Sequence, residues 1–311
     1  MLNSTPSPQE AAQELLARSQ ARKHLPQFID YLGFDYKFAA HHRLLMSELE
    51  AVDEGRTERL MVLMPPGSAK STYSSVLFPP WFMGRHPQFA ILGVSNTLDL
   101  AERFSRRVRN IIATSEYGNI FRGNGISADS AAAGNWETRL GGEFFAAGVG
   151  VAIAGRRADL GLIDDPIKSR EEADSERIRQ KQWDWYINDF LTRLKPGARQ
   201  ILIQTRWHED DLGGRILERE RERWRVVKLP MLAVADDPLN RKIGERLWPE
   251  WFTEEMIATA KMDTRAWNAL YQQDPVPDEG DYFKRDNFSE YDITPGNMRM
   301  YAASDFAVTD G

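Results

Sequence analysis

Five short apolar runs alternate with longer helical patterns along most of this chain. The apolar runs are 60–64, 89–94, 160–163, 200–204 and 224–229, and helices are predicted between them at 98–113, 175–194 and 211–223. Buried strands that alternate with helices form a mostly parallel sheet with helices on both faces. Ligands bind such a sheet at the carboxyl ends of its strands. The residues that directly follow each run are therefore the first candidates for a functional site.

Helix is expected at the start of the chain, and a domain boundary is expected near its end. Ser7, Pro8 and Glu10 form a capping box with proline at the first helical position, and a second helix is predicted over 41–52. The segment 274–280 is rich in proline and acidic residues and ends the alternation. We therefore expect a domain over 1–274, a connector over 275–297, and over 298–311 the first strand of a second domain in which the sequence stops.

Composition excludes several kinds of chemistry. The chain has no cysteine, which rules out disulfides, thiol catalysis and cysteine-ligated metals. Its net charge of −6 argues against coating nucleic acid through bulk electrostatics, so any such contact must be local. The first residues lack the pattern of a signal peptide. The longest uncharged apolar stretch, 144–155, is too short to span a bilayer, so we expect it to be buried core and expect no membrane contact.

The loop after the first predicted strand suits a phosphate group. Residues 64–72 have the sequence MPPGSAKST and precede a predicted helix. Backbone N–H groups and the helix dipole at such a turn bind an anion, and Lys70 would then reach the β- and γ-phosphates. The residues expected to bind the nucleotide are Pro66, Gly67, Ser68, Ala69, Lys70, Ser71 and Thr72. The usual pattern has glycine where this chain has Met64 and Ala69, and a surface turn with a solvated lysine is the alternative.

Two consecutive carboxylates follow the strand at 160–163. Asp164 would hold Mg²⁺ together with the hydroxyl of Ser71, and Asp165 would orient or deprotonate the attacking water. Neighbouring strand residues point to opposite faces, so the two acids can reach different targets. Alone, this motif favours a turn in which Asp165 caps a helix. The lysine loop and the carboxylate strand together favour a nucleoside triphosphate hydrolase.

Polar residues also flank two of the predicted strands. Thr205, like Gln204, lies where a polar side chain could sense the γ-phosphate, although the acids that follow suit a helix cap equally well. Arg156 and Arg157 are expected near the rim of the crevice, where arginine can stabilise phosphoryl transfer in its own subunit or in a neighbouring one. The alternatives for these arginines are an ion pair with Asp159 and a solvated loop.

Four short motifs stand in a fixed order along the chain. They are PPGSAKST at 65–72, GRRAD at 155–159 leading into DDP at 164–166, WDWY at 183–186 and TRWH at 205–208. In this order they resemble the large terminase subunit of tailed bacteriophages. The resemblance implies an α/β P-loop NTPase of the additional-strand type with a mostly parallel central sheet, followed by the first strand of a ribonuclease-H-like nuclease domain. In that second domain Asp305 matches the first metal-binding carboxylate, and many members have Glu where this chain has Asp165.

The resemblance further implies a viral DNA-packaging motor that uses ATP and Mg²⁺. Its partners would be double-stranded DNA, the portal protein of the procapsid, the small terminase subunit and further copies of itself in a ring. It would work in the cytoplasm of the host cell and would be absent from the mature virion. A full-length chain would also cut DNA, whereas this sequence is expected to hydrolyse ATP only, because Asp305 alone cannot hold two metal ions.

Two other functions stay open. A helicase-like DNA-dependent ATPase is the nearest alternative, although such enzymes commonly need a second lobe, for which the stretch after Pro275 is short. A nucleotide-binding scaffold without hydrolysis would explain the missing glycines of the loop. Asp165 beside Asp164 argues against the scaffold, since a protein that only binds nucleotide does not need the second carboxylate.

Overall fold

The computed structural model describes residues 7–153 and 155–276, except for the side chains of residues 129–131. The chain divides into two units, Met1–Pro277 and Asp278–Gly311, and the following description concerns the first. The predicted connector from residue 277 onward and the predicted nuclease strand with Asp305 lie outside the described residues. Within the described ranges no helix is long and apolar enough to cross a bilayer.

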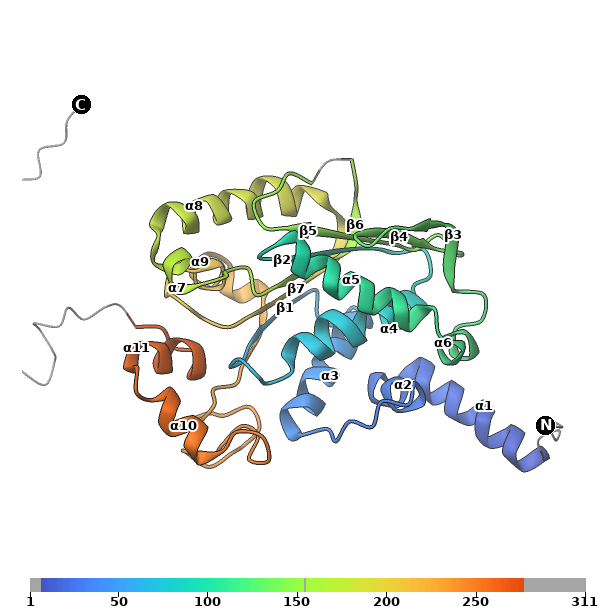
Figure 1. Ribbon diagram of the computed structural model, residues 1–311, viewed down its shortest axis with the longest axis horizontal. Helices are drawn as coiled ribbons and strands as arrows, with labels where there is room; N and C mark the ends of the chain where they lie inside the picture. Colours follow the sequence, from blue (N-terminus) through green and yellow to red (C-terminus); the bar gives the residue numbers. More distant parts are fainter. Residues whose placement is uncertain (1–6, 154, 277–311) are drawn as a thin grey trace, which may run out of the picture. The chain divides into compact units, whose positions relative to one another are not determined.

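An eight-stranded sheet forms the centre of this unit, with the strand order β3-β4-β5-β2-β6-β7-β1-β8 (Figure 1). The strands are β1 (Arg59–Leu63), β2 (Ala90–Ser95), β3 (Ile126–Ala131), β4 (Asn135–Thr138), β5 (Glu143–Gly148), β6 (Ala158–Asp164), β7 (Leu194–Gln204) and β8 (Arg225–Lys228). Neighbouring strands in the series β5, β2, β6, β7, β1 and β8 pair in parallel. At one edge of the sheet, β4 pairs antiparallel with both β3 and β5. The predicted mostly parallel α/β sheet is thus confirmed, and β7 is an additional strand between β1 and β6.

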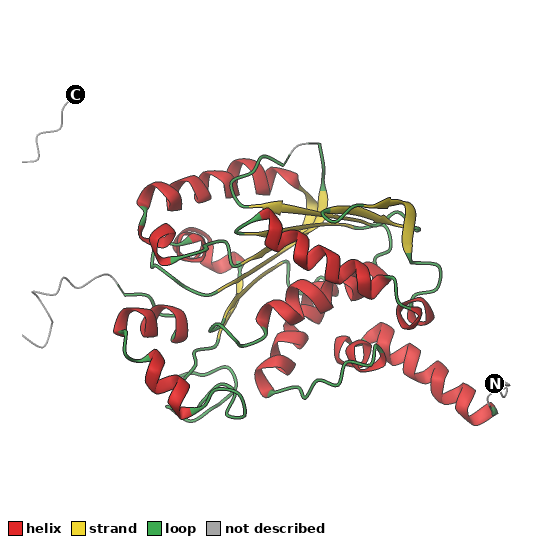
Figure 2. Ribbon diagram, viewed as in Figure 1, coloured by secondary structure: helices red, strands yellow, loops and turns green. Residues whose placement is uncertain are grey.

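Helices cover both faces of the sheet, and Figure 2 shows them on either side of the strands. The α-helices are α1 (Pro8–Lys23), α2 (Leu25–Tyr31), α3 (Ala40–Asp53), α4 (Phe78–Arg85), α5 (Leu98–Ile112), α6 (Ser115–Ile120), α7 (Arg170–Asp174), α8 (Glu176–Trp185), α9 (Leu212–Glu220), α10 (Glu254–Ala260) and α11 (Thr264–Ala266). One hydrophobic cluster packs α3, α4 and α5 against the sheet, and a second cluster packs α8 and α9 against it. The sheet therefore lies between two separate hydrophobic layers.

Alternating side chains of the central strands build these two layers. On β1, Leu60 and Val62 belong to the cluster with α3 to α5, whereas Met61 and Leu63 belong to the cluster with α8 and α9. All four side chains are at most 1% exposed. A strand that is apolar on both faces is a continuous apolar run, because successive side chains point to opposite faces. This is why β1 could be predicted from sequence.

The capping box at the start of α1 is confirmed, because Ser7 Oγ accepts from the Glu10 N–H and the Glu10 carboxylate accepts from the Ser7 N–H. The helices predicted at 41–52, 98–113 and 211–223 correspond to α3, α5 and, as far as Glu220, α9. The helix predicted over 175–194 is only partly α-helical. It is regular up to Trp185 and continues as a π-helical segment and a 3₁₀ turn.

Two expectations about the middle of the chain need correction. The antiparallel edge was not predicted, because half of the residues of β3 are polar and β4 has only four residues, so neither is an apolar run. The stretch 144–155 is mostly buried in its first half, which belongs to β5. Beyond β5 burial is uneven, because Val151 is 53% exposed whereas Ile153 is buried in the cluster with α8 and α9.

Candidate functional site

A tight loop connects the carboxyl end of β1 to a helix. Residues 64–71 lead into a π-helical segment, Thr72–Leu77, which continues as α4. Gly67 has φ +79° and Ala69 has φ +62°, so both adopt the left-handed region. Glycine adopts it freely, whereas for alanine it costs about 1–2 kcal/mol. A strained backbone persists only where the surroundings hold it, and such positions cluster at ligand sites.

Two buried histidines of α3 hold this loop. The Nε2 atoms of His41 and His42 each lie 3.2 Å from the carbonyl oxygen of Ser68. His42 Nδ1 accepts from the Ala39 N–H at 3.1 Å, so in the neutral ring Nε2 carries the proton and donates to Ser68. The two side chains therefore hold the loop through a carbonyl oxygen and do not occupy its N–H groups.

Burial keeps both histidines neutral. Desolvation lowers the pKa of His41 to about 3 and that of His42 to about 4, while the bond to the Ser68 carbonyl partly offsets each shift. The folded state therefore takes up no proton on these rings when the pH falls through 6.5, whereas the unfolded state does. These two groups make folding less favourable as the pH decreases below about 6.5.

Lys70 joins the loop to the ends of two further strands. Its side chain is 6% exposed, and its Nζ donates to Thr205 Oγ1 at 2.8 Å and lies 3.3 Å from Asp165 Oδ2. Thr205 follows β7 and Asp165 follows β6, so three parallel strands meet at their carboxyl ends. The structure thus brings together Lys70, Asp165 and Thr205, which lie far apart in the sequence.

Asp164 is the buried member of the carboxylate pair. It is 1% exposed, its Oδ1 accepts from Ser71 Oγ at 2.9 Å, and its Oδ2 accepts from Ser75 Oγ. Burial, and then the charge of Asp165, raises its pKa above the usual range of a carboxylate. The bond from Ser75, the charge of Lys70 and the bond from Ser71 oppose this rise.

Asp165 points away from Asp164 and toward the lysine. Its backbone has φ +43°, a left-handed conformation that aspartate tolerates better than most residues. Its N–H donates to the Ile203 carbonyl at 2.8 Å, and its Oδ1 accepts from the Thr205 N–H at 2.7 Å. The side chain is 31% exposed, so solvent reaches it. The two neighbouring acids therefore contact different partners, as the strand geometry predicts.

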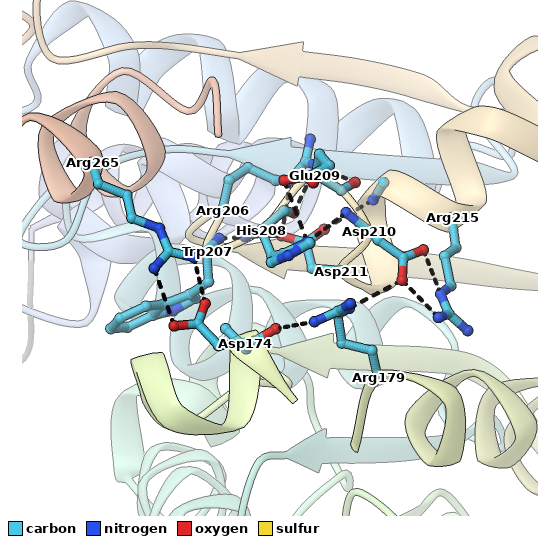
Figure 3. A network of polar contacts seen from close by, with 12 residues as sticks. Asp174, Arg179, Arg206, Trp207, His208, Glu209, Asp210, Asp211, Arg215 and Arg265 are labelled. Atoms are coloured by element: carbon cyan, nitrogen blue, oxygen red, sulfur yellow. Dashed lines mark hydrogen bonds and ion pairs between the residues drawn. The ribbon is translucent and has the colours of Figure 1, made fainter. Parts of the chain in front are cut away.

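The chain after Thr205 is fixed by a polar network (Figure 3). Its buried centre is Asp211, which is fully buried and caps α9 by accepting from the Gly214 N–H at 2.9 Å. Asp211 Oδ2 accepts from Arg206 Nε at 2.9 Å and from the backbone N–H groups of Trp207 and His208. The helix-cap alternative is therefore correct for Asp211. Gln204 packs against Gly213 of α9, so of the two polar residues only Thr205 faces Lys70.

Further arginine–carboxylate pairs surround that centre, as Figure 3 shows. Asp210 pairs with Arg179 of α8 at 3.0 Å and with Arg215 of α9 at 2.7 Å. Asp174 of α7 pairs with Arg265 of α11 at 2.6 Å. Asp210 thus connects the loop after Thr205 directly to α8 and α9, whereas the pair of Asp174 and Arg265 joins α7 to α11.

A cavity of about 290 Å³ lies beside the phosphate-type loop. Its lining residues are Asp35, Tyr36, Lys37, His42, Ala69, Thr72, Tyr73 and Trp248. The ring of His42 lies 4.6 Å from that of Tyr73 and 4.6 Å from that of Trp248. Sequence reasoning missed this cavity, because its aromatic residues come from separate segments with no diagnostic spacing. The only sequence signal was that one of these aromatic residues, Tyr73, directly follows the loop.

The oxygen atoms at Ser71 and Asp164 are suitable ligands for Mg²⁺, which prefers hydroxyl, carboxylate and phosphate oxygens. Across residues 7–153 and 155–276 there is no group of three or more histidine, aspartate and glutamate side chains that could hold a metal by itself. The donor set therefore fits an ion that also binds substrate phosphates, as Mg²⁺ commonly does.

Arg156 and Arg157 lie at the amino end of β6, opposite to the carboxyl ends that carry Lys70, Asp165 and Thr205. They precede β6, and Arg156 Nη1 is 3.3 Å from the carboxylate of Glu143, the first residue of the parallel strand β5. Asp164 ends β6, about 20 Å further along the strand at its usual rise. The expectation that these arginines lie near the rim of the crevice is wrong within a single chain. The alternative of an ion pair is correct for Arg156, but its partner is Glu143 and not Asp159. Asp159 pairs instead with Lys195.

Comparison with known proteins gives a family. A family model described as "Terminase large subunit, T4likevirus-type, N-terminal" matches residues 61–290, more than half of the chain. The ATPase domain of the large terminase of Thermus phage P74-26, solved as a mutant, aligns with a TM-score of 0.49 and 12% identity over 80% of this chain and 98% of that one. The large terminase of bacteriophage HK97 aligns with a TM-score of 0.45 and 10% identity over 77% of this chain. The match spans about half of the HK97 protein, 51%. No curated protein matches the sequence significantly.

Proposed function

The chain belongs to the family of the terminase large subunit, and on this basis we propose that it is the ATPase of a viral DNA-packaging motor. The proposed reaction is the hydrolysis of ATP to drive double-stranded DNA into a procapsid. The observation that carries this proposal is the convergence of Lys70, Asp165 and Thr205 at the carboxyl ends of three parallel strands. A lysine, a carboxylate and a hydroxyl at one edge of such a sheet are the groups that phosphoryl transfer to water requires.

The triphosphate would bind the loop from Pro66 to Thr72 through backbone N–H groups and Lys70. In the structure, the Lys70 ammonium is paired with Asp165 and Thr205. The β- and γ-phosphates carry more negative charge than one carboxylate, so they would draw the ammonium away. Nucleotide binding would therefore also release Asp165 from its ion pair.

Once released, Asp165 is placed to act on water. Its Oδ1 stays bound to the Thr205 N–H, which fixes the orientation of the carboxylate. Its partly exposed side chain can then orient a water molecule and accept its proton. Thr205 Oγ1, which also loses Lys70, can donate to the γ-phosphate. Thr205 therefore links the state of the nucleotide to the network around Asp211.

Ser71 and Asp164 are the residues that would hold Mg²⁺ in this site. When bound, the ion neutralises charge on the β- and γ-phosphate oxygens. The carboxylate of Asp164 is already oriented toward the Ser71 hydroxyl, so this part of the chain needs no rearrangement.

The cavity beside the loop is proposed to take the base of the nucleotide. It adjoins Ala69 and Thr72, and its aromatic side chains offer faces on which a base can stack. His42 lines this cavity and also binds the Ser68 carbonyl, so one side chain would contact both the base and the loop.

Arg156 and Arg157 are proposed to act on the nucleotide of a neighbouring subunit in the ring, since they cannot reach that of their own chain. Mixed rings of a variant lacking both arginines and a Lys70→Ala variant should then recover part of the activity. No recovery at any mixing ratio in verified rings would contradict this role.

Family membership also supports the remaining proposals. They are binding of double-stranded DNA, assembly as a ring, contacts with the portal protein and the small terminase subunit, and action in the cytoplasm of the infected cell. Nuclease activity is proposed only for a full-length protein.

Steady-state phosphate release tests the proposed function. With ATP and Mg²⁺, we expect release by the parent protein and about 10- to 100-fold weaker ATP binding by Lys70→Ala, because the variant loses a charge-assisted contact. The matched control is Lys242→Ala, which removes an exposed lysine outside the site and should leave binding unchanged. ATP binding without phosphate release would favour the scaffold, and release that requires single-stranded DNA would favour the helicase-like enzyme.

A further inference from the structure

Ser75 contacts the carboxylate of Asp164 from the second turn of the helix after the loop. Its Oγ donates to Asp164 Oδ2, while Ser71 Oγ donates to Oδ1 at 2.9 Å. Ser75 is 2% exposed and Asp164 is 1% exposed, so water does not compete for this contact. The four-residue spacing places both serines on the same side of the helix. Each oxygen of the carboxylate therefore has its own hydroxyl donor.

The helix is irregular at this point, and its own sequence explains why. Ser75 lies in the π-helical segment Thr72–Leu77, where the N–H of Phe78 donates to the carbonyl of Tyr73. Pro79 and Pro80 follow and have no N–H, so they cannot donate to the carbonyls of Ser75 and Val76 as an α-helix would require. A π-helical turn of this kind commonly occurs at functional sites.

The two serines have different access to a ligand. Ser71 is in the loop that faces the phosphates, and its hydroxyl is the one expected to turn to a metal ion. Ser75 lies one turn deeper, and its hydroxyl donates to the carboxylate of Asp164. When Ser71 changes partner, Ser75 is the hydroxyl that still fixes the carboxylate of Asp164.

We propose that Ser75 is a positioning residue for Mg²⁺, which holds the carboxylate of Asp164 in the orientation that the ion requires. The inference rests on the proposed function, because it takes Asp164 as part of the Mg²⁺ site. Hydrogen-bond partners behind a metal ligand commonly contribute about 10- to 100-fold to metal affinity. Ser75→Ala should therefore raise by about that factor the Mg²⁺ concentration needed for half-maximal binding of nucleotide.

The chain provides a matched control in Ser74. This serine is fully buried in the same helical turn, and its Oγ has no hydrogen-bond partner in the described part of the chain. Ser74→Ala removes the same atom from the same layer of the core without touching Asp164. A shift of the Mg²⁺ requirement in Ser75→Ala but not in Ser74→Ala would show that the contact with Asp164 is responsible.

The experiment is a Mg²⁺ titration of the binding of a fluorescent, non-hydrolysable ATP analogue to the full chain. Binding in EDTA gives the part of the affinity that does not depend on the ion, and Ser75→Ala should leave that part unchanged. An equal Mg²⁺ requirement in the parent and Ser75→Ala, or an equal shift in Ser74→Ala, would overturn the inference about Ser75. Binding to the parent that does not respond to Mg²⁺ would instead overturn the proposed Mg²⁺ site itself.

A second pair of variants keeps the test decisive if Ser75→Ala does not fold. Ser75→Thr and Ser75→Val add the same bulk to the core and differ in the hydroxyl. A Mg²⁺ requirement near that of the parent for Thr, and a raised one for Val, supports the positioning role. The same requirement in both overturns it.

Discussion

Replacing Asp165 by asparagine should lower the rate of ATP hydrolysis by about 10²- to 10⁴-fold, the usual contribution of a positioned general base. Asparagine tolerates the left-handed backbone at this position, where φ is +43°, and its Oδ1 can still accept from the Thr205 N–H. ATP binding should be unchanged or tighter, because Lys70 no longer leaves a charged partner when it moves to the phosphates.

Single-turnover phosphate release at saturating ATP measures this effect, and equilibrium binding of ATP shows that the site is intact. Asp184→Asn is the matched control, since it neutralises an exposed carboxylate of α8 and should hydrolyse ATP like the parent. Turnover by Asp165→Asn at the parent rate would show that another group activates the water.

Replacing Asp211 by alanine should destabilise the fold by about 3–5 kcal/mol, the cost of breaking a buried ion pair. The change leaves Arg206, which is 7% exposed, without its carboxylate partner. It also removes the cap of α9 and the acceptor for two backbone N–H groups of the loop after Thr205. The loss should affect both the helix and the loop.

Urea unfolding monitored by circular dichroism measures the loss. Asp174→Ala breaks the pair with Arg265, in which both side chains are about one-third exposed, at 37% and 33%. A pair of this kind contributes at most about 1 kcal/mol, so the control should stay close to the parent. A cost for Asp211→Ala below that of Asp174→Ala would contradict the central place of Asp211 in the network.

The convergence of the site could be predicted from sequence because it depends on strands that are apolar on both faces. The strand β1 and the carboxyl-terminal parts of β6 and β7 are short, mostly apolar and buried. They are followed directly by the loop of Lys70, by Asp165 and by Thr205, respectively. The carboxyl ends of parallel strands lie on the same side of the sheet, so residues that directly follow such strands come close together.

The positions of Arg156 and Arg157 follow from the same property of parallel strands. They precede β6, and residues that precede a parallel strand lie at its amino end, away from the site. The rule was available from sequence and would have placed them correctly. Ser75 could also have been found, because it follows Ser71 at the helical spacing of four residues.

The remaining features depend on contacts between segments that carry no shared pattern. Trp248 reaches the cavity beside the loop from a region without regular structure. The contacts of His41 and His42 with the Ser68 carbonyl join a helix to a loop that lies 27 and 26 residues away in the sequence. The edge strand β3 lacks the apolar run that marks a buried strand, and β4 has only four residues. Such features follow from the packed structure, and a single sequence does not encode them in a periodic form.

A structure of the chain with a non-hydrolysable ATP analogue and Mg²⁺ tests the proposed site most directly. We expect the triphosphate against residues 66–72 and Lys70 Nζ on the phosphates, away from Asp165 and Thr205, with the base in the cavity lined by His42 and Trp248. An analogue bound elsewhere, or bound at the loop while Lys70 stays paired with Asp165, would contradict the assignment of this edge of the sheet as the site of ATP hydrolysis.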